Sequence, residues 1–348
     1  MKINQFIMRE KKYKLCLRLV AIILCLLFCG CGNSVISEDR VQDGLPLLDP
    51  ADGMAKDIKI ELYYRLAGEA YLVPVSRNIS VRANEREERA IVRTLIEGVP
   101  QQPVSTDVSA LFPTGTSIVE VSLDSGILYI TLSDGFLDES AVESVRQEKS
   151  TLGEEYEAAL DRAEQELYLT RRLGVYSLVN TITGYMDNIR VQILVDTEGT
   201  GKGERLSNGM LGLDGRGEGA SDLMEPLGFV GDVVASAESI VSCMLTRMQG
   251  GEYERAYSLF MEAEVDGAQK PSYDDFEAKL LELGAVTGFE VVSSLQEDDV
   301  TTVVTVNLDF TSAQGEPVHI NQATVFLKKE GDIYKTVYGP FMRILEEA

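Results

Sequence analysis

The sequence predicts an α+β protein with two folded parts, and three observations support this prediction. In the first part, runs rich in β-branched and aromatic residues alternate with runs of helical periodicity. In the second part, helical periodicity comes first and strand alternation follows. Residues 196–222 contain eight glycines, which favours a loop between the parts because ordering glycine costs more backbone entropy than ordering other residues.

The first part reads as a regular alternation of elements. A helix ends at Gly98, before Pro100, and the turn Asp124-Ser125-Gly126 joins two strands of a hairpin. A long helix is indicated by apolar residues at three-to-four spacing. In chain order we expect strands at 58–66 and 70–81, a helix at 84–98, hairpin strands at 116–123 and 127–133, a helix at 154–187 and a strand at 190–195.

The second part begins with helices. Ile240, Met244 and Met248 share one helical face, and Gly250-Gly251 separates this helix from a second one. A third helix is expected from the N-cap Ser272 to Gly284. Everything after Gly284 reads as strand, with strict alternation over 302–312 and a turn at Glu330-Gly331-Asp332.

The amino terminus has the pattern of a secretory signal. Six basic residues against one acid precede an uninterrupted run of ten apolar residues, 19–28. A membrane-spanning helix needs roughly 20 apolar residues, so this run predicts a signal peptide and not a permanent transmembrane anchor.

Three cysteines, Cys25, Cys29 and Cys31, close this segment. A zinc site would need a second group of ligands, and the only histidine, His319, lies nearly 300 residues away. The stretch Phe28-Cys29-Gly30-Cys31 resembles a bacterial lipobox, in which the signal is cut before a diacylated cysteine. The resemblance implies cleavage between Gly30 and Cys31 and a diacylglycerol anchor on Cys31 at the outer face of the cell membrane; the alternatives are an ordinary cleaved signal and an uncleaved one.

Processing would make an acidic chain more acidic. The formal net charge is −24, and loss of residues 1–30 would leave 318 residues with a net charge of −29, because that segment carries six of the 32 basic and one of the 56 acidic residues. Such a charge excludes nucleic acid as a natural partner, since phosphate binding needs a basic surface. It also argues against a body lying flat on anionic lipid.

The expected organisation has four segments. Residues 1–30 form the signal peptide and residues 31–56 an acidic tether. The first folded domain spans 57–229, including the glycine-rich loop 196–222, and the second spans 230–348. We expect two independent cores, with the first proteolytic cuts inside 197–221 because that backbone lacks secondary structure.

Several sequence motifs of the first part resemble the GerMN domain, a module of spore-germination and sporulation lipoproteins in Gram-positive bacteria. These motifs lie at 71–77, 111–137 and 175–196, and "DLMEPL" at 222–227 resembles the end of many members. The resemblance implies a mixed sheet packed by two helices, and no catalytic residues. The residues that match the central motif are Pro113, Gly115, Thr116, Leu132, Ser133 and Phe136. Pro113 and Gly115 are expected to shape a turn, and Phe136 is expected to fill the core after the hairpin.

The order of elements over about 234–348 is similar to the cystatin-like, nuclear-transport-factor-type fold. That resemblance implies a second α+β domain, with helices on a curved antiparallel sheet. It implies that the closing segment, "GDIYKTVYGPF", is the last strand.

No motif for an enzyme, a cofactor or a metal is present. His319 could line the mouth of the second fold, but a surface histidine is the expected interpretation. Cys243 is expected to be a buried, inert thiol in a helix. A hydrolase therefore has no residue support.

Two functional classes remain. The first is a non-enzymatic, membrane-anchored lipoprotein that assembles with other envelope or sporulation proteins as a scaffold; the second binds a small ligand or regulates a membrane sensor. In the first class, a partner could add a strand at the edges 59–65 or 190–196, with Leu62 and Ile193 at their centres.

Overall fold

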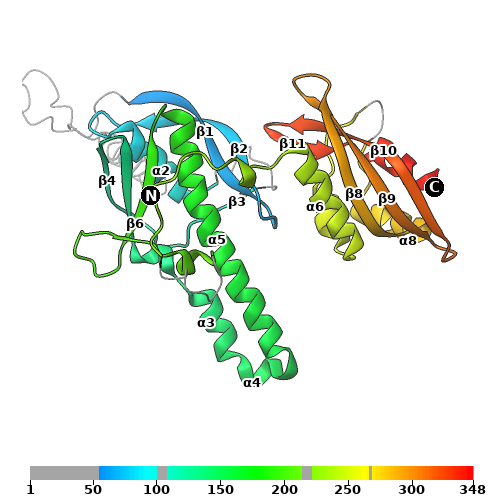
Figure 1. Ribbon diagram of the computed structural model, residues 1–348, viewed down its shortest axis with the longest axis horizontal. Coiled ribbons are helices and arrows are strands. Elements are labelled where there is room, and N and C mark those ends of the chain that lie inside the picture. Colours follow the sequence, from blue (N-terminus) through cyan, green and yellow to red (C-terminus); the bar gives the residue numbers. More distant parts are fainter. Residues whose placement is uncertain (1–54, 100–107, 214–221, 266–268, 348) are drawn as a thin grey trace, which may run out of the picture. The chain divides into compact units, whose positions relative to one another are not determined.

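The computed structural model describes residues 55–99, 108–213, 222–265 and 269–347 (Figure 1). Its described residues form two antiparallel sheets and one mixed sheet, with helices on them. The predicted α+β class is therefore confirmed, as is a mixed sheet followed by helices and an antiparallel sheet.

The first sheet has the strand order β2-β1-β3. Its strands are β1 (Lys56–Leu66), β2 (Leu72–Val81) and β3 (Val108–Ser109). Apolar residues that pair across β1 and β2, such as Ile58 with Ile79, are buried on the same face. Helix α2 (Glu87–Glu97) buries Ala90, Ile91 and Leu95 in the same core and ends at Gly98, as predicted.

The mixed sheet has the strand order β4-β5-β6-β7. Its strands are β4 (Ile118–Asp124), β5 (Ile127–Ser133), β6 (Arg190–Asp196) and β7 (Glu204–Arg205). The β4–β5 hairpin is the predicted one, and both Ser125 and Gly126 have positive φ, as a tight two-residue turn requires. Helix α5 (Tyr156–Tyr185) then returns the chain so that β5 and β6 run parallel.

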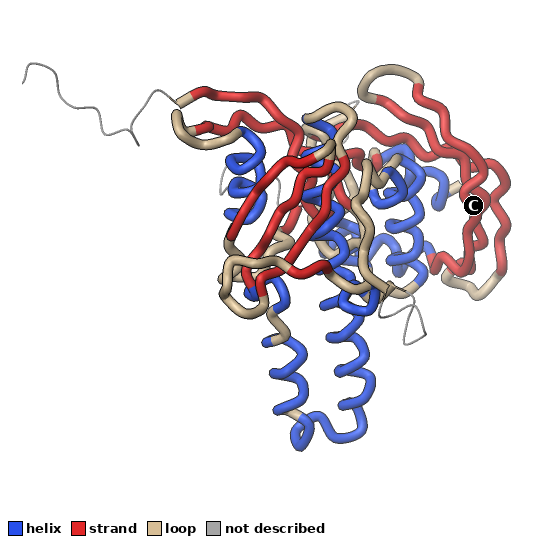
Figure 2. The backbone as a smooth tube through the Cα atoms, turned by 60° about the vertical axis from the view of Figure 1, so that its left-hand side comes forward, coloured by secondary structure: helices blue, strands red, loops and turns tan. Residues whose placement is uncertain are grey.

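Two short helices before α5 were not predicted. They are α3 (Ser140–Gln147) and α4 (Lys149–Leu152). Figures 1 and 2 show α3 side by side with the first half of α5, and Arg146 bonds Glu164 across them at 3.2 Å. Val142 is the buried apolar residue of α3, so this segment offers almost no apolar periodicity to read.

The glycine-rich segment is not the bare loop that the sequence predicted. It contains β7 and the 3₁₀ turn η5 (Asn208–Leu211), and Leu206 and Leu211 enter the core. A Cβ on Gly203 would lie 2.6 Å from the Cβ of Leu194, so glycine here permits close packing against β6. The prediction is wrong for residues 204–211, and residues 214–221 lie outside the described part.

The last part of the chain places helices before strands, as predicted. The helices are α6 (Ala237–Gln249), α7 (Tyr253–Ser258) and α8 (Tyr273–Leu283). The Ser272 side chain accepts the Asp275 amide, which confirms the predicted N-cap. Four antiparallel strands follow in the order β11-β10-β9-β8: β8 (Gly284–Gln296), β9 (Thr301–Ser312), β10 (Pro317–Glu330) and β11 (Ile333–Thr336).

The end of the chain corrects the expectation that everything after Gly284 is strand. Residues Tyr338–Glu346 form helix α9, which follows β11. Phe341, Met342 and Leu345 are its buried residues, and the Phe341 ring packs 5.5 Å from Phe260, centroid to centroid. The short apolar run fits either state by itself, and packing against Phe260 and strand β10 favours the helix.

The described helices include none that is both long and apolar enough to cross a bilayer. The described residues all fall within one compact unit, so the boundary at residues 229 and 230 stays a prediction.

Leu211→Ala tests whether the glycine-rich segment belongs to the core. Leu211 is fully buried, and its truncation should lower the free energy of unfolding by about 2–5 kcal/mol. The neighbouring Met210, 40% exposed, is the control, and Met210→Ala should cost much less. Urea unfolding measures both; equal and small losses would mean that the segment does not pack in solution.

Candidate functional site

A buried polar site surrounds Glu69, in the turn between β1 and β2. Two backbone hydrogen bonds, Leu66 N to Tyr71 O and Glu69 N to Leu66 O, close this turn at 2.9 Å each. Arg65 Nε donates to the Glu69 carbonyl at 2.8 Å. The Glu69 residue is only 4% exposed, so its carboxylate needs charged partners.

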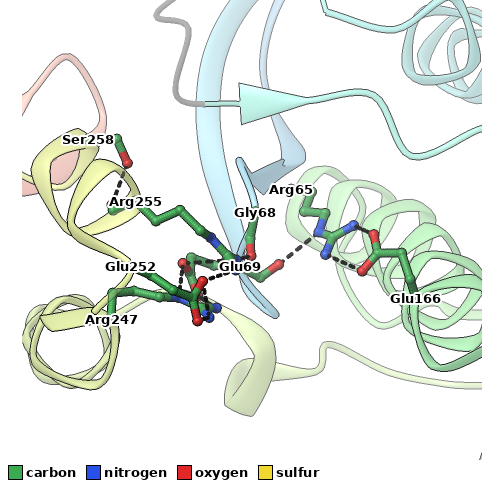
Figure 3. Close-up of polar contacts among 8 residues, drawn as sticks. All are labelled: Arg65, Gly68, Glu69, Glu166, Arg247, Glu252, Arg255 and Ser258. Atoms are coloured by element: carbon green, nitrogen blue, oxygen red, sulfur yellow. Dashed lines mark hydrogen bonds and ion pairs between the residues drawn. The ribbon is translucent and has the colours of Figure 1, made fainter. Parts of the chain in front are cut away.

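Two arginines of the following helices supply these partners (Figure 3). Arg247 of α6 binds both carboxylate oxygens of Glu69, from Nε at 3.0 Å and from Nη2 at 2.8 Å. Arg255 of α7 approaches the same carboxylate at 3.4 Å. Glu252 accepts from Arg247 at 3.1 Å and from Arg255 at 2.7 Å, so the two guanidinium groups share two carboxylates.

The Arg65 guanidinium continues this set of ion pairs on the other side of the turn. It pairs through two nitrogens with Glu166 of α5, one of them at 3.1 Å. This contact lowers the pKa of the Glu166 carboxyl through the hydrogen bonds from Arg65. Three arginines and three glutamates therefore balance one another around the turn.

A pocket of about 400 Å³ opens beside these groups, and Cys243 of α6 lines it. The thiol is buried, as expected. Burial raises the pKa of Cys243 to about 12, and the nearby Glu69 carboxylate adds to this effect. A thiol with that pKa stays protonated at neutral pH and is a poor nucleophile.

The GerMN-type motif residues build a locked turn at the start of the hairpin. Gly115 has φ +105°, and the Thr116 amide donates to the Pro113 carbonyl at 3.0 Å. Ser133 Oγ donates to Gly115 O at 3.2 Å and accepts from the Ser117 amide at 3.0 Å. Leu132 and Phe136 are fully buried. These residues have structural roles here.

Gly135 shows how closely this turn is packed. A Cβ at Gly135 would lie 2.5 Å from the Gly115 carbonyl oxygen, so no other residue fits without movement. The sequence motif does not single out Gly135, because an isolated glycine gives no sign of the backbone that it faces.

His319 lies on the surface, as expected. Its Nδ1 is 2.5 Å from Asp309 on the neighbouring strand, and this hydrogen bond raises the pKa of the imidazole. His319 is at the rim of an open pocket of about 470 Å³, next to Val318, Ile320 and Ile344. Within the described ranges, no group of three or more His, Cys, Asp or Glu side chains is placed to hold a metal ion.

Neither of the two expected docking strands is a terminal strand of its sheet. Leu62 and Ile193 are fully buried. Along β1, Thr181 of α5 accepts from the Tyr63 amide at 3.1 Å and Ser177 donates to the Tyr63 carbonyl. Strand β6 lies between β5 and β7, and Leu227 exchanges two backbone hydrogen bonds with Val191 at 2.8 and 2.9 Å.

Two other outcomes complete the comparison with the sequence. Gly30 and Cys31, the predicted cleavage and acylation site, lie outside the described residues. Glu69 was missed because one glutamate in a turn gives no pattern. Its partners Arg247 and Arg255 are 178 and 186 residues away, and only the fold brings them close.

Comparisons with known proteins agree with the first resemblance. A family model described as "Germane: Sporulation and spore germination" matches residues 61–199. No curated protein matches the chain.

Three solved structures share low similarity with this chain. The tandem GerMN domains of the Bacillus subtilis sporulation protein GerM are 12% identical, with 52% of this chain covered and a TM-score of 0.29. A Clostridium perfringens protein described as a candidate lipoprotein is 16% identical over 49% of this chain and 87% of its own, with a TM-score of 0.23. The first GerMN domain of GerM is 14% identical over 41% of this chain and 84% of its own, with a TM-score of 0.24.

This chain matches about half (48%) of the length of the tandem GerM structure. The match to the family model includes β2, the motif turn, the β4–β5 hairpin, α5 and β6. Residues 61–199 of this chain therefore match the Germane family, which is described for sporulation and spore germination.

Proposed function

We propose that this chain is a lipid-anchored, extracytoplasmic protein that acts in sporulation or spore germination of a Gram-positive bacterium. Its role is to hold other envelope proteins together, without catalysis. The observation that carries this proposal is the Germane domain at residues 61–199.

The anchor is the part of the proposal that the amino-terminal sequence supports. A basic segment, ten apolar residues and Phe28-Cys29-Gly30-Cys31 follow one another in the order of a lipoprotein signal. Two acyl chains on Cys31 would hold the protein stably, whereas a single chain binds membranes only marginally.

The docking surface that we propose is the outer edge of β4. Strand β4 ends its sheet, so one side of its backbone has no strand neighbour among the described residues. Leu123, near the end of β4, is 44% exposed and lines an open pocket of about 610 Å³ together with Tyr185 and Met186. An added strand gains backbone hydrogen bonds from such an edge and specificity from a side-chain pocket.

The rim of this pocket suggests the chemistry of the partner strand. Glu85, Glu87 and Glu88 line it together with Arg86. Glu87 is paired with Lys56 and accepts from the Tyr185 hydroxyl. An excess of carboxylates favours a partner strand with lysine or arginine beside an apolar residue.

Cys31→Ala tests the anchor. Without the acylated cysteine, the protein should leave the membrane fraction or persist as a precursor with its signal attached. Metabolic labelling with a fatty acid should mark the wild type and the control Cys29→Ser, but not Cys31→Ala. Normal maturation and membrane retention of Cys31→Ala would reject lipidation at this residue.

Leu123→Lys tests the docking edge in sporulating cells. A lysine at the edge repels a basic strand and leaves an ammonium to be buried, so cross-linking to the envelope partner should fall by about tenfold or more. Leu281→Lys is the matched control, because Leu281 is 63% exposed on α8, and it should cross-link as the wild type does. Equal cross-linking by both variants would exclude the β4 edge.

A further inference from the structure

The Glu69 site suggests a conformational device that the proposed function does not require. We propose that the turn at residues 67–70 is a latch on helices α6 and α7, and that Glu69 holds it closed over the thiol of Cys243. The proposal rests on the ion pairs, the turn geometry and the pocket that the thiol shares with them.

Glu69 is the only residue of the turn that reaches both helices through its side chain. Its two carboxylate oxygens accept hydrogen bonds from Arg247 Nε at 3.0 Å and Nη2 at 2.8 Å, and Arg255 adds a longer contact at 3.4 Å (Figure 3). Removing one partner from a buried ion pair leaves an uncompensated charge. The latch therefore opens only if these contacts break together.

The backbone of the turn is shaped for this contact. Gly68 has φ +73°, and a Cβ there would lie 3.0 Å from Arg255 Nη2. Glycine thus lets the guanidinium reach the turn, where it also donates to the Gly68 carbonyl. On the other side, Arg65 holds the Glu69 carbonyl at 2.8 Å, so the latch is attached to β1 and through Glu166 to α5.

Cys243 is the group that the closed latch covers. It lies one helical turn before Arg247 on α6, lines the same pocket of about 400 Å³ and is 8% exposed. Its raised pKa, about 12, has burial as the main cause and Glu69 as the second. Opening the latch would give solvent and thiol reagents access to this sulfur.

The experiment measures the reactivity of this thiol. The full chain is prepared with Cys16, Cys25, Cys29 and Cys31 replaced by serine, which leaves Cys243 as the single cysteine of the five. The rate of its reaction with a disulfide reagent is measured for the parent, Glu69→Gln and Arg247→Gln. Both substitutions should raise the rate by about tenfold or more, the ratio that about 1.4 kcal/mol of lost closing free energy produces.

Glu85→Gln is the matched control. Glu85 and Arg93 form a comparable two-pronged ion pair, with distances of 2.9 and 3.0 Å, in the first part of the chain and away from Cys243. Breaking it should leave the rate of thiol reaction unchanged. A similar acceleration in this control would show general loosening and would overturn the latch.

The two test variants separate opening from simple electrostatics. Glu69 raises the pKa of Cys243, whereas Arg247 lowers it. If the latch did not open, the Cys243 thiol would therefore react faster in Glu69→Gln and more slowly in Arg247→Gln. Opposite changes, or no change in either, would overturn the proposal.

Loss of the fold is checked by hydrogen exchange of the amides in β9. If the β9 amides of Arg247→Gln are no longer protected from exchange, Arg247→Lys is used as the test variant in its place. Lysine keeps the charge but not the two-pronged contact. A faster thiol reaction in Arg247→Lys with β9 still protected supports the latch, and an unchanged rate overturns it.

Discussion

The hydrogen bonding of one buried stretch of α5 is the constraint on which much of the fold depends. Ser177, Asn180 and Thr181 are fully buried, and a buried polar group without a partner costs about 1–3 kcal/mol. Ser177 and Thr181 bond the carbonyl and amide of Tyr63, while Asn180 bonds both backbone groups of Val230, at 2.9 and 2.7 Å. One helix therefore fixes strand β1 and the chain that leads into α6.

This constraint also limits how the protein can act. Because α5 bonds both backbone groups of Tyr63 in β1, and β7 and Leu227 pair with β6, these strands have neighbours on both sides. Among the described residues, β4 is the terminal strand of its sheet and lies beside a pocket lined by three glutamates, which is why we propose it as the docking edge. In the proposed role, the lipid on Cys31 and the tether keep an acidic body near the membrane, while electrostatic repulsion keeps it from lying on anionic lipid.

The sequence predicts the secondary-structure elements better than it predicts which elements pack beside one another. The β4–β5 hairpin, α5 and the Ser272 cap follow from local signals, and the structure has all three. The buried leucines of the glycine-rich segment and helix α9 depend on packing that periodicity does not reveal. Strand patterns likewise cannot distinguish a central strand from an edge strand, which is why Leu62 and Ile193 were assigned to free edges. The Glu69 site could not be predicted from the sequence because it is formed by long-range contacts.

The most direct test of the account is scanning calorimetry of the full chain and of Asn180→Ala. If α5 couples the Germane domain to the helices and sheet that follow it, the wild type should unfold in one cooperative transition. Asn180→Ala should lower the midpoint temperature of that transition or split it into two, because the Val230 backbone loses its hydrogen-bond partner. Two separate transitions in the wild type, neither of them moved by Asn180→Ala, would contradict the account.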